Sequence, residues 1–284
     1  MINRILVALD LDIDTPLAMR YGIKLAKKFK ASVSGLAVVD TADIATQVGG
    51  GAIGTIYYAE ELRKYMAEDS TREAAELLKK FEKMADEAGV KHSQLMEEGV
   101  PYERIIEDLK YHDLLVIGRE SHFFFNRPEK DTDTLADIVK KSTAPTLVVN
   151  EAYREIDRVL IAHDGSSASA RSLQWFIQLE PFGKNIEMEV VHVCDMDDET
   201  TVDKSRLLMH LVSDYLKAHS YSSINEKLLD EGNTGEVIIK HVKETGADLV
   251  VMGAHSMSAI RRLTFGSTTH KLVKESPVPL FLSN

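Results

Sequence analysis

The fold is indicated by a stretch that the chain contains twice: INRILVALD at residues 2–10 and IDRVLIAHD at residues 156–164. Each copy holds a continuous apolar run rich in β-branched residues, Ile5–Leu9 and Val159–Ala162, and then reaches an aspartate. Such a run is typical of a strand that is buried on both faces of a parallel sheet. We therefore predict two equivalent buried strands that lead to Asp10 and to Asp164.

Two further blocks recur in the same order. DLLVIG at residues 113–118 returns as DLVVMG at 248–253, and STAPTLVV at 142–149 returns as SPVPLFL at 276–282. Three repeated blocks in one order indicate an internal duplication, and 284 residues suit two domains. We place these domains at residues 1–150 and 154–284.

Within each half, short apolar runs alternate with longer segments of helical periodicity. Residues 32–39 and 187–193 have the composition of second strands, whereas residues 60–88 and 201–219 carry apolar residues at helical spacing. The resulting βαβαβαβαβ pattern predicts an α/β fold. We expect two doubly wound, five-stranded parallel sheets, arranged as a tandem repeat.

Composition argues against several classes of function. The 45 acidic and 34 basic residues give a formal charge of −11, which disfavours general nucleic-acid binding and docking on anionic membranes. The single cysteine, Cys194, rules out an internal disulfide and is predicted to be a small buried residue. The ten histidines show no metal-ligand spacing, so no metal site is expected.

The first residues do not resemble a signal peptide, because the apolar run is short and Asp10 follows it. No apolar stretch approaches the length of about 18 residues that a membrane span needs. We therefore expect a cytoplasmic protein.

The loop after the fourth strand of the second half carries the strongest motif. It has Gly253, two residues, Ser256, nine residues and then Gly266-Ser267, and a helix is predicted over 267–275. The unpaired N–H groups and the dipole at a helix N-terminus favour an anion. This loop is therefore a candidate phosphate cradle.

This spacing resembles that of the ATP-binding universal stress proteins, which have Gly, two residues, Gly, nine residues and then Gly-Ser or Gly-Thr. Only the second glycine differs, because Ser256 stands in its place. Since both halves share the family's strand pattern, the chain is similar to a tandem two-domain member. Right-handed crossovers and the resemblance together favour strand order 3-2-1-4-5, in which ligands bind beyond the carboxyl ends of strands one and four.

The resemblance implies an adenine-nucleotide site in the second half and a role in stress-linked regulation. Asp164 would meet the ribose or base, Val193 the adenine, and Gly266, Ser267 and Thr268 the phosphates. The ligand would be ATP or AMP, with Mg²⁺ only alongside ATP. The full set of expected residues is Ala162, His163, Asp164, Val193, Met252, Gly253, Ser256, Gly266, Ser267 and Thr268.

The first half is predicted to have lost its triphosphate site. Alignment on Pro145 and Pro279 places Thr132 and Asp133 opposite Gly266 and Ser267, and a carboxylate at that position would repel a phosphate. Further acidic residues follow the first strand at Asp10, Asp12 and Asp14.

Two other functions stay open. In a nucleotide-free interaction scaffold both pockets would have decayed, and Ser256 and the acidic first half favour this alternative. Slow ATP hydrolysis is the weaker alternative. The sequence has no nucleophile elbow and specifies no catalytic residue, so we do not expect a dedicated enzyme.

Three interpretations concern packing. We expect the last strands, Leu147–Val149 and Leu280–Leu282, to pair so that the halves form an intramolecular pseudo-dimer, with a homodimer or other protein partners as further options. At least one of Phe123–Phe125 is expected in the first pocket or at the domain seam. The glycines of residues 49–54 are interpreted as a loop, because no Gly-Lys-Ser or Gly-Lys-Thr follows them.

Overall fold

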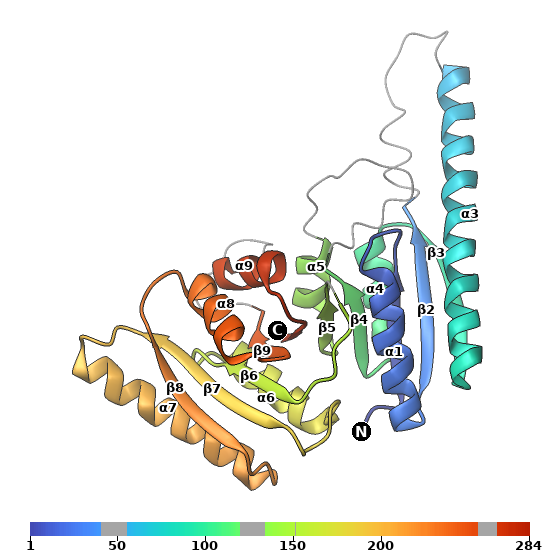
Figure 1. Ribbon diagram of the computed structural model, residues 1–284. Helices are drawn as coiled ribbons and strands as arrows, with labels where there is room; N and C mark the ends of the chain where they lie inside the picture. Colours follow the sequence, from blue (N-terminus) through green and yellow to red (C-terminus); the bar gives the residue numbers. More distant parts are fainter. Residues whose placement is uncertain (41–55, 120–133, 151, 255–265) are drawn as a thin grey trace. The chain divides into compact units, whose positions relative to one another are not determined.

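The computed structural model describes residues 1–40, 56–119, 134–150, 152–254 and 266–284 (Figure 1). They form two compact units, residues 2–138 and residues 139–284, and Met1 belongs to the second. The chain is an α/β protein, as predicted. The expected features at residues 49–54 and 123–125 lie outside the described residues.

The unit of residues 2–138 contains a parallel sheet in the order β3-β2-β1-β4. Helices α1 and α3 contact each other and pack on this sheet, as does α4 (Figure 1). The element bounds are β1 Arg4–Leu9, α1 Thr15–Phe29, β2 Ser32–Val39, α3 Ile56–Ala88, β3 His92–Glu98, α4 Pro101–Leu109, β4 Leu114–Gly118 and α5 Thr134–Lys141.

The unit of residues 139–284 has the strand order β5-β10-β9-β6-β7-β8. The five strands of the second repeat therefore follow the predicted 3-2-1-4-5 order, and all four of their pairings are parallel. The bounds are β5 Thr146–Val149, β6 Arg158–Ala162, α6 Ser167–Leu179, β7 Glu187–Cys194, α7 Glu199–Ala218, β8 Ile224–Asp230, α8 Thr234–Thr245, β9 Leu249–Gly253, α9 Ser267–Glu275 and β10 Leu280–Ser283.

Strand β5 belongs by sequence to the first repeat but lies in the unit of residues 139–284. It pairs antiparallel with β10, with Leu147 opposite Phe281. The pairing of the two last strands that the sequence predicted is therefore present. Both strands are fully buried, and the Phe281 ring meets Phe176 of α6 edge-on at 5.4 Å.

The repeated Asp-Leu that opens β4 and β9 has one structural role in both repeats. An Asp113 carboxylate oxygen accepts hydrogen bonds from the backbone N–H groups of Asn3 and Arg4, at 2.7 and 2.9 Å. Asp248 binds the N–H groups of Asp157 and Arg158 in the same way, at 3.2 and 3.0 Å. Each aspartate thus fixes the start of the first strand beside the fourth, which aligns the strand ends where a ligand pocket can form.

Cys194 is a free, buried cysteine, as predicted. Among the described residues, no helix is both long enough and apolar enough to cross a membrane.

Candidate functional site

A cavity of about 330 Å³ lies at the carboxyl ends of β6 and β9, where the winding of the second sheet reverses. Its volume is within the range of small-molecule sites. Of the expected site residues, the cavity brings together all except Ser256, which lies outside the described residues. Its lining consists of Ala162, His163, Asp164, Ser169, Val191, His192, Val193, Thr234, Ile238, Met252, Gly253, Gly266, Ser267, Thr268 and Thr269.

A tight turn between β6 and α6 positions Asp164 at the rim of the pocket. The Asp164 carboxylate accepts the backbone N–H of Ser166 at 3.0 Å, and Gly165 between them has a φ of +79°, which favours glycine. Desolvation in the turn raises the pKa of the Asp164 carboxyl, but hydrogen bonds from Ser166 and Ser169 lower it, and the net pKa is below its usual value. Asp164 is exposed and anionic at neutral pH, so it suits hydroxyl donors such as those of a ribose.

Two histidines contribute ring nitrogens to the same pocket. Nδ1 of His163 accepts the Gly165 N–H at 3.1 Å, so its proton is on Nε2 in the neutral ring. Nδ1 of His192 lies 2.8 Å from the carbonyl oxygen of His163 and must donate to it, so in the neutral ring Nε2 of His192 carries a lone pair. Burial lowers the pKa of His163, although Asp164 acts in the opposite direction, and His163 is therefore neutral at pH 7.

Gly253 allows the end of β9 to approach the first turn of α6. A Cβ atom at this position would lie 2.5 Å from the backbone nitrogen of Ser169 and 2.7 Å from the carbonyl carbon of Ala168. Both are backbone atoms and cannot move without the helix. The glycine is therefore required by packing at the pocket floor.

The N-terminus of α9 forms one wall of the pocket. Gly266 caps this helix in an extended conformation, and no side chain among the described residues caps it. The N–H groups of the first turn, at Ser267 and Thr268, therefore have no intrahelical acceptor. Thr269 donates its hydroxyl to the carbonyl of Ala254 at 3.0 Å, which holds this helix end beside β9.

Sequence reasoning missed several lining residues. Val191 and His192 directly precede the expected Val193 on β7, so strand position could have indicated them. Thr234 and Ile238 come from α8, and no motif connects that helix to the loop after β9. They reach the pocket only because α8 packs against α9.

The corresponding region of the first repeat is built differently. Asp10 is 1% exposed, and its carboxylate accepts the N–H of Leu11 at 2.6 Å. Asp14 is 2% exposed. The counterpart of the exposed Asp164 is thus buried, and Thr132 and Asp133 lie outside the described residues.

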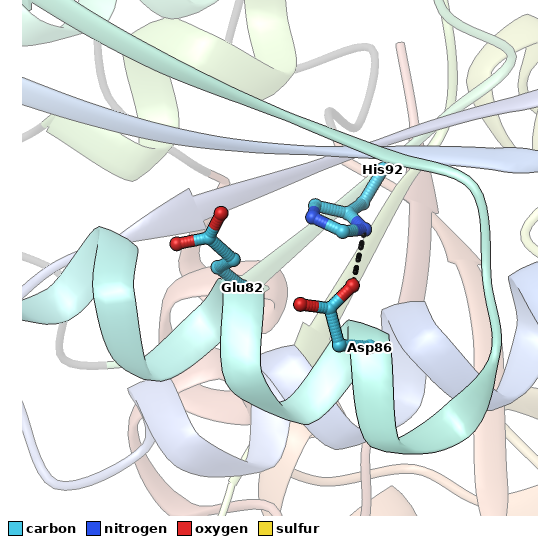
Figure 2. Close-up of side chains that lie close together, drawn as sticks. All are labelled: Glu82, Asp86 and His92. Atoms are coloured by element: carbon cyan, nitrogen blue, oxygen red, sulfur yellow. Dashed lines mark ion pairs between the residues drawn. The ribbon is translucent and has the colours of Figure 1, made fainter.

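One group of potential metal ligands lies in the unit of residues 2–138. Figure 2 shows Glu82 and Asp86 on one face of α3 and His92 at the start of β3, with one potential ligand atom from each within 4.8 Å of the others. Nδ1 of His92 is 3.8 Å from Asp86 and 3.1 Å from the carbonyl of Val90. Both carboxylates are exposed, whereas His92 is partly buried.

The fold and the cavity together define a class: a tandem of doubly wound α/β repeats with a cavity at the switch point of the second. The model of the universal stress protein family matches residues 1–150 and 155–283. The chain therefore belongs to the universal stress protein family.

Individual relatives agree with this assignment. Universal stress protein Slr1230 of Synechocystis is 23% identical and is matched over 93% of this chain and 91% of its own length. Universal stress protein MJ0531 of Methanocaldococcus jannaschii is 34% identical over 49% of this chain and 76% of its own. A crystal structure of a universal stress protein from Archaeoglobus fulgidus has a TM-score of 0.67 at 19% identity, covering 99% of this chain and 96% of that one. This last likeness shows the fold.

Proposed function

We propose that the pocket of the second repeat binds an adenine nucleotide, ATP or AMP, and that this binding serves stress-linked regulation. The observation that carries the proposal is the composition of one cavity. The N-terminus of α9, which has no side-chain cap, lines one part of it, and valine and histidine side chains from β7 and the end of β6 line another. Such a cavity suits a ligand with an anionic group at one end and a planar base at the other.

The groups that line the cavity suit the phosphate, the ribose and the base of a nucleotide. The N–H groups of the first turn of α9 would receive phosphate oxygens, with the hydroxyls of Ser267 and Thr268 beside them. The anionic Asp164 would accept ribose hydroxyls, and Val191, Val193 and Ile238 would pack against the base. Mg²⁺ would accompany ATP only, where it would offset the negative charge of the phosphates.

The first test is chemical identification. The protein is purified under mild conditions, denatured and filtered, and the filtrate is analysed by mass spectrometry. We expect ATP or AMP in the filtrate, and calorimetry on ligand-stripped protein should give one site per chain. If no nucleotide is released and none binds, the interaction scaffold is the better interpretation.

A charge variant then locates the site. Ser267→Asp adds a carboxylate to the first turn of α9, where it favours the helix but repels a phosphate. Thr200→Asp makes the same type of change in the first turn of α7, outside the pocket lining. We expect only Ser267→Asp to weaken ATP binding, by about tenfold or more. Equal affinities of the two variants would contradict this placement.

A further inference from the structure

His163 and His192 line the same pocket, and in the neutral form of each ring the free nitrogens have opposite hydrogen-bonding character. His163 has its Nδ1 occupied by the Gly165 N–H, and His192 has its Nδ1–H occupied by the His163 carbonyl. Among the described residues, neither Nε2 has a partner. The two pocket-lining residues therefore have one unused donor, His163 Nε2–H, and one unused acceptor, His192 Nε2.

These two groups lie where a base would be placed. An anionic group is drawn to the N-terminus of α9, at Gly266 and Ser267. The rest of a nucleotide must then extend toward the ends of β6 and β7, which provide Ala162, His163 and residues 191–193. The valines there offer apolar surface, and the imidazoles offer the polar groups.

We propose that His192 and His163 read the edge of the base and select adenine. Nε2 of His192 accepts a hydrogen bond from the exocyclic amino group, and Nε2–H of His163 donates to the adjacent ring nitrogen. Hypoxanthine has the inverse pattern, a carbonyl acceptor beside an N–H donor. Hypoxanthine could bond to the same two histidines only if the base were rotated to exchange its two polar groups. A phosphate bound at the N-terminus of α9 opposes that rotation.

This proposal rests on the proposed function and adds to it the residues that determine base specificity. The test compares AMP with inosine monophosphate, which differ only at this edge of the base. Calorimetry at about pH 8, above the usual titration range of imidazole, should give tighter binding of AMP by about tenfold. A hydrogen bond lost at a partly buried site has roughly this effect on affinity.

Asparagine variants remove the Nε2 atom of each histidine and keep the hydrogen bond that its Nδ1 makes. His192→Asn can still donate to the His163 carbonyl but has no acceptor at the Nε2 position. His163→Asn can still accept the Gly165 N–H but has no donor at that position. The matched control is His210→Asn on the exposed face of α7, where His210 pairs with Asp214 at 3.3 Å.

In each pocket variant we expect the AMP preference to fall to about threefold or less, while the control keeps the wild-type ratio. Unfolding followed through Trp175 should confirm that all variants fold. The proposal is wrong if wild-type protein binds both nucleotides equally, or if His192→Asn keeps the wild-type ratio. If wild-type protein binds neither AMP, ATP nor inosine monophosphate, the proposed function itself fails, which is a distinct result.

Discussion

The close approach at Gly253 allows a quantitative test of how the pocket floor is built. In Gly253→Ala, the new Cβ would lie 2.5 Å from the Ser169 nitrogen, about 0.9 Å short of the ordinary contact distance of 3.4 Å. The backbone here is not left-handed, so alanine introduces no conformational strain of its own. The effect of the substitution is therefore steric, and the first turn of α6 must move.

The size of the effect follows from two opposing contributions. Overpacking of a well-packed contact costs about 1–3 kcal/mol. Replacing glycine by alanine stabilises by about 0.4–1 kcal/mol, because the unfolded chain loses freedom. We expect Gly253→Ala to lower the free energy of unfolding by about 1–2 kcal/mol. The displaced turn carries Ser166 and Ser169, so nucleotide affinity should fall as well.

The chain provides a convenient probe for this measurement. Trp175 is the only tryptophan and lies on α6, so its fluorescence during urea unfolding reports on the unit of residues 139–284. Gly232→Ala is the matched control, because its Cβ meets only the Val237 side chain, at 3.2 Å. If the two variants unfold at the same urea concentration, the packing argument for Gly253 is wrong.

Three other predictions use the same preparation. Asp248→Ala leaves two backbone N–H groups without their acceptor and should cost about 1–3 kcal/mol of unfolding free energy, measured through Trp175; an unchanged midpoint would refute the role given to this carboxylate. Phe281→Ala removes a side chain that is 1% exposed and should cost about 3–5 kcal/mol, whereas Phe182→Ala, at a less buried neighbour of Phe176, should cost clearly less. Burial lowers the pKa of His163, so in a ring-proton NMR titration it should become protonated below about pH 6.5. The stability that its neutral form provides is complete above that pH and is lost as the pH falls toward the lowered pKa; a His163 that titrates above pH 6.5 would contradict this.

The central strands could be predicted from sequence because of where they lie. A parallel strand with helices over both faces needs apolar residues at every position, and β1, β4, β6 and β9 meet that need. The duplication then allowed each half to support the interpretation of the other. Helix α9 was predicted after Gly266 with the bounds that the structure has, Ser267–Glu275.

The edge strands gave no comparable signal. β3 (HSQLMEE) and β8 (INEKLLD) are largely exposed and rich in charged or polar residues. Their extended conformation comes from pairing with β2 and β7, which no local pattern reveals. The same holds for the pocket: the residues near the Gly253 and Gly266 motif were predicted, whereas those of α8 depend on helix packing.

Comparison of the two repeats separates residues that maintain the fold from those available for ligand binding. Asp113 and Asp248 make the same hydrogen bonds in both repeats, so their recurrence reflects a requirement of the sheet. Asp10 and Asp164 recur equally well in the sequence, yet Asp10 is buried, whereas Asp164 is exposed and lines a pocket. A buried carboxylate is costly unless it is hydrogen-bonded, and the Asp10 carboxylate accepts the N–H of Leu11. Asp164 lines a cavity, and this difference in environment, which the sequence repeat conceals, supports the proposal that a ligand binds in the second repeat.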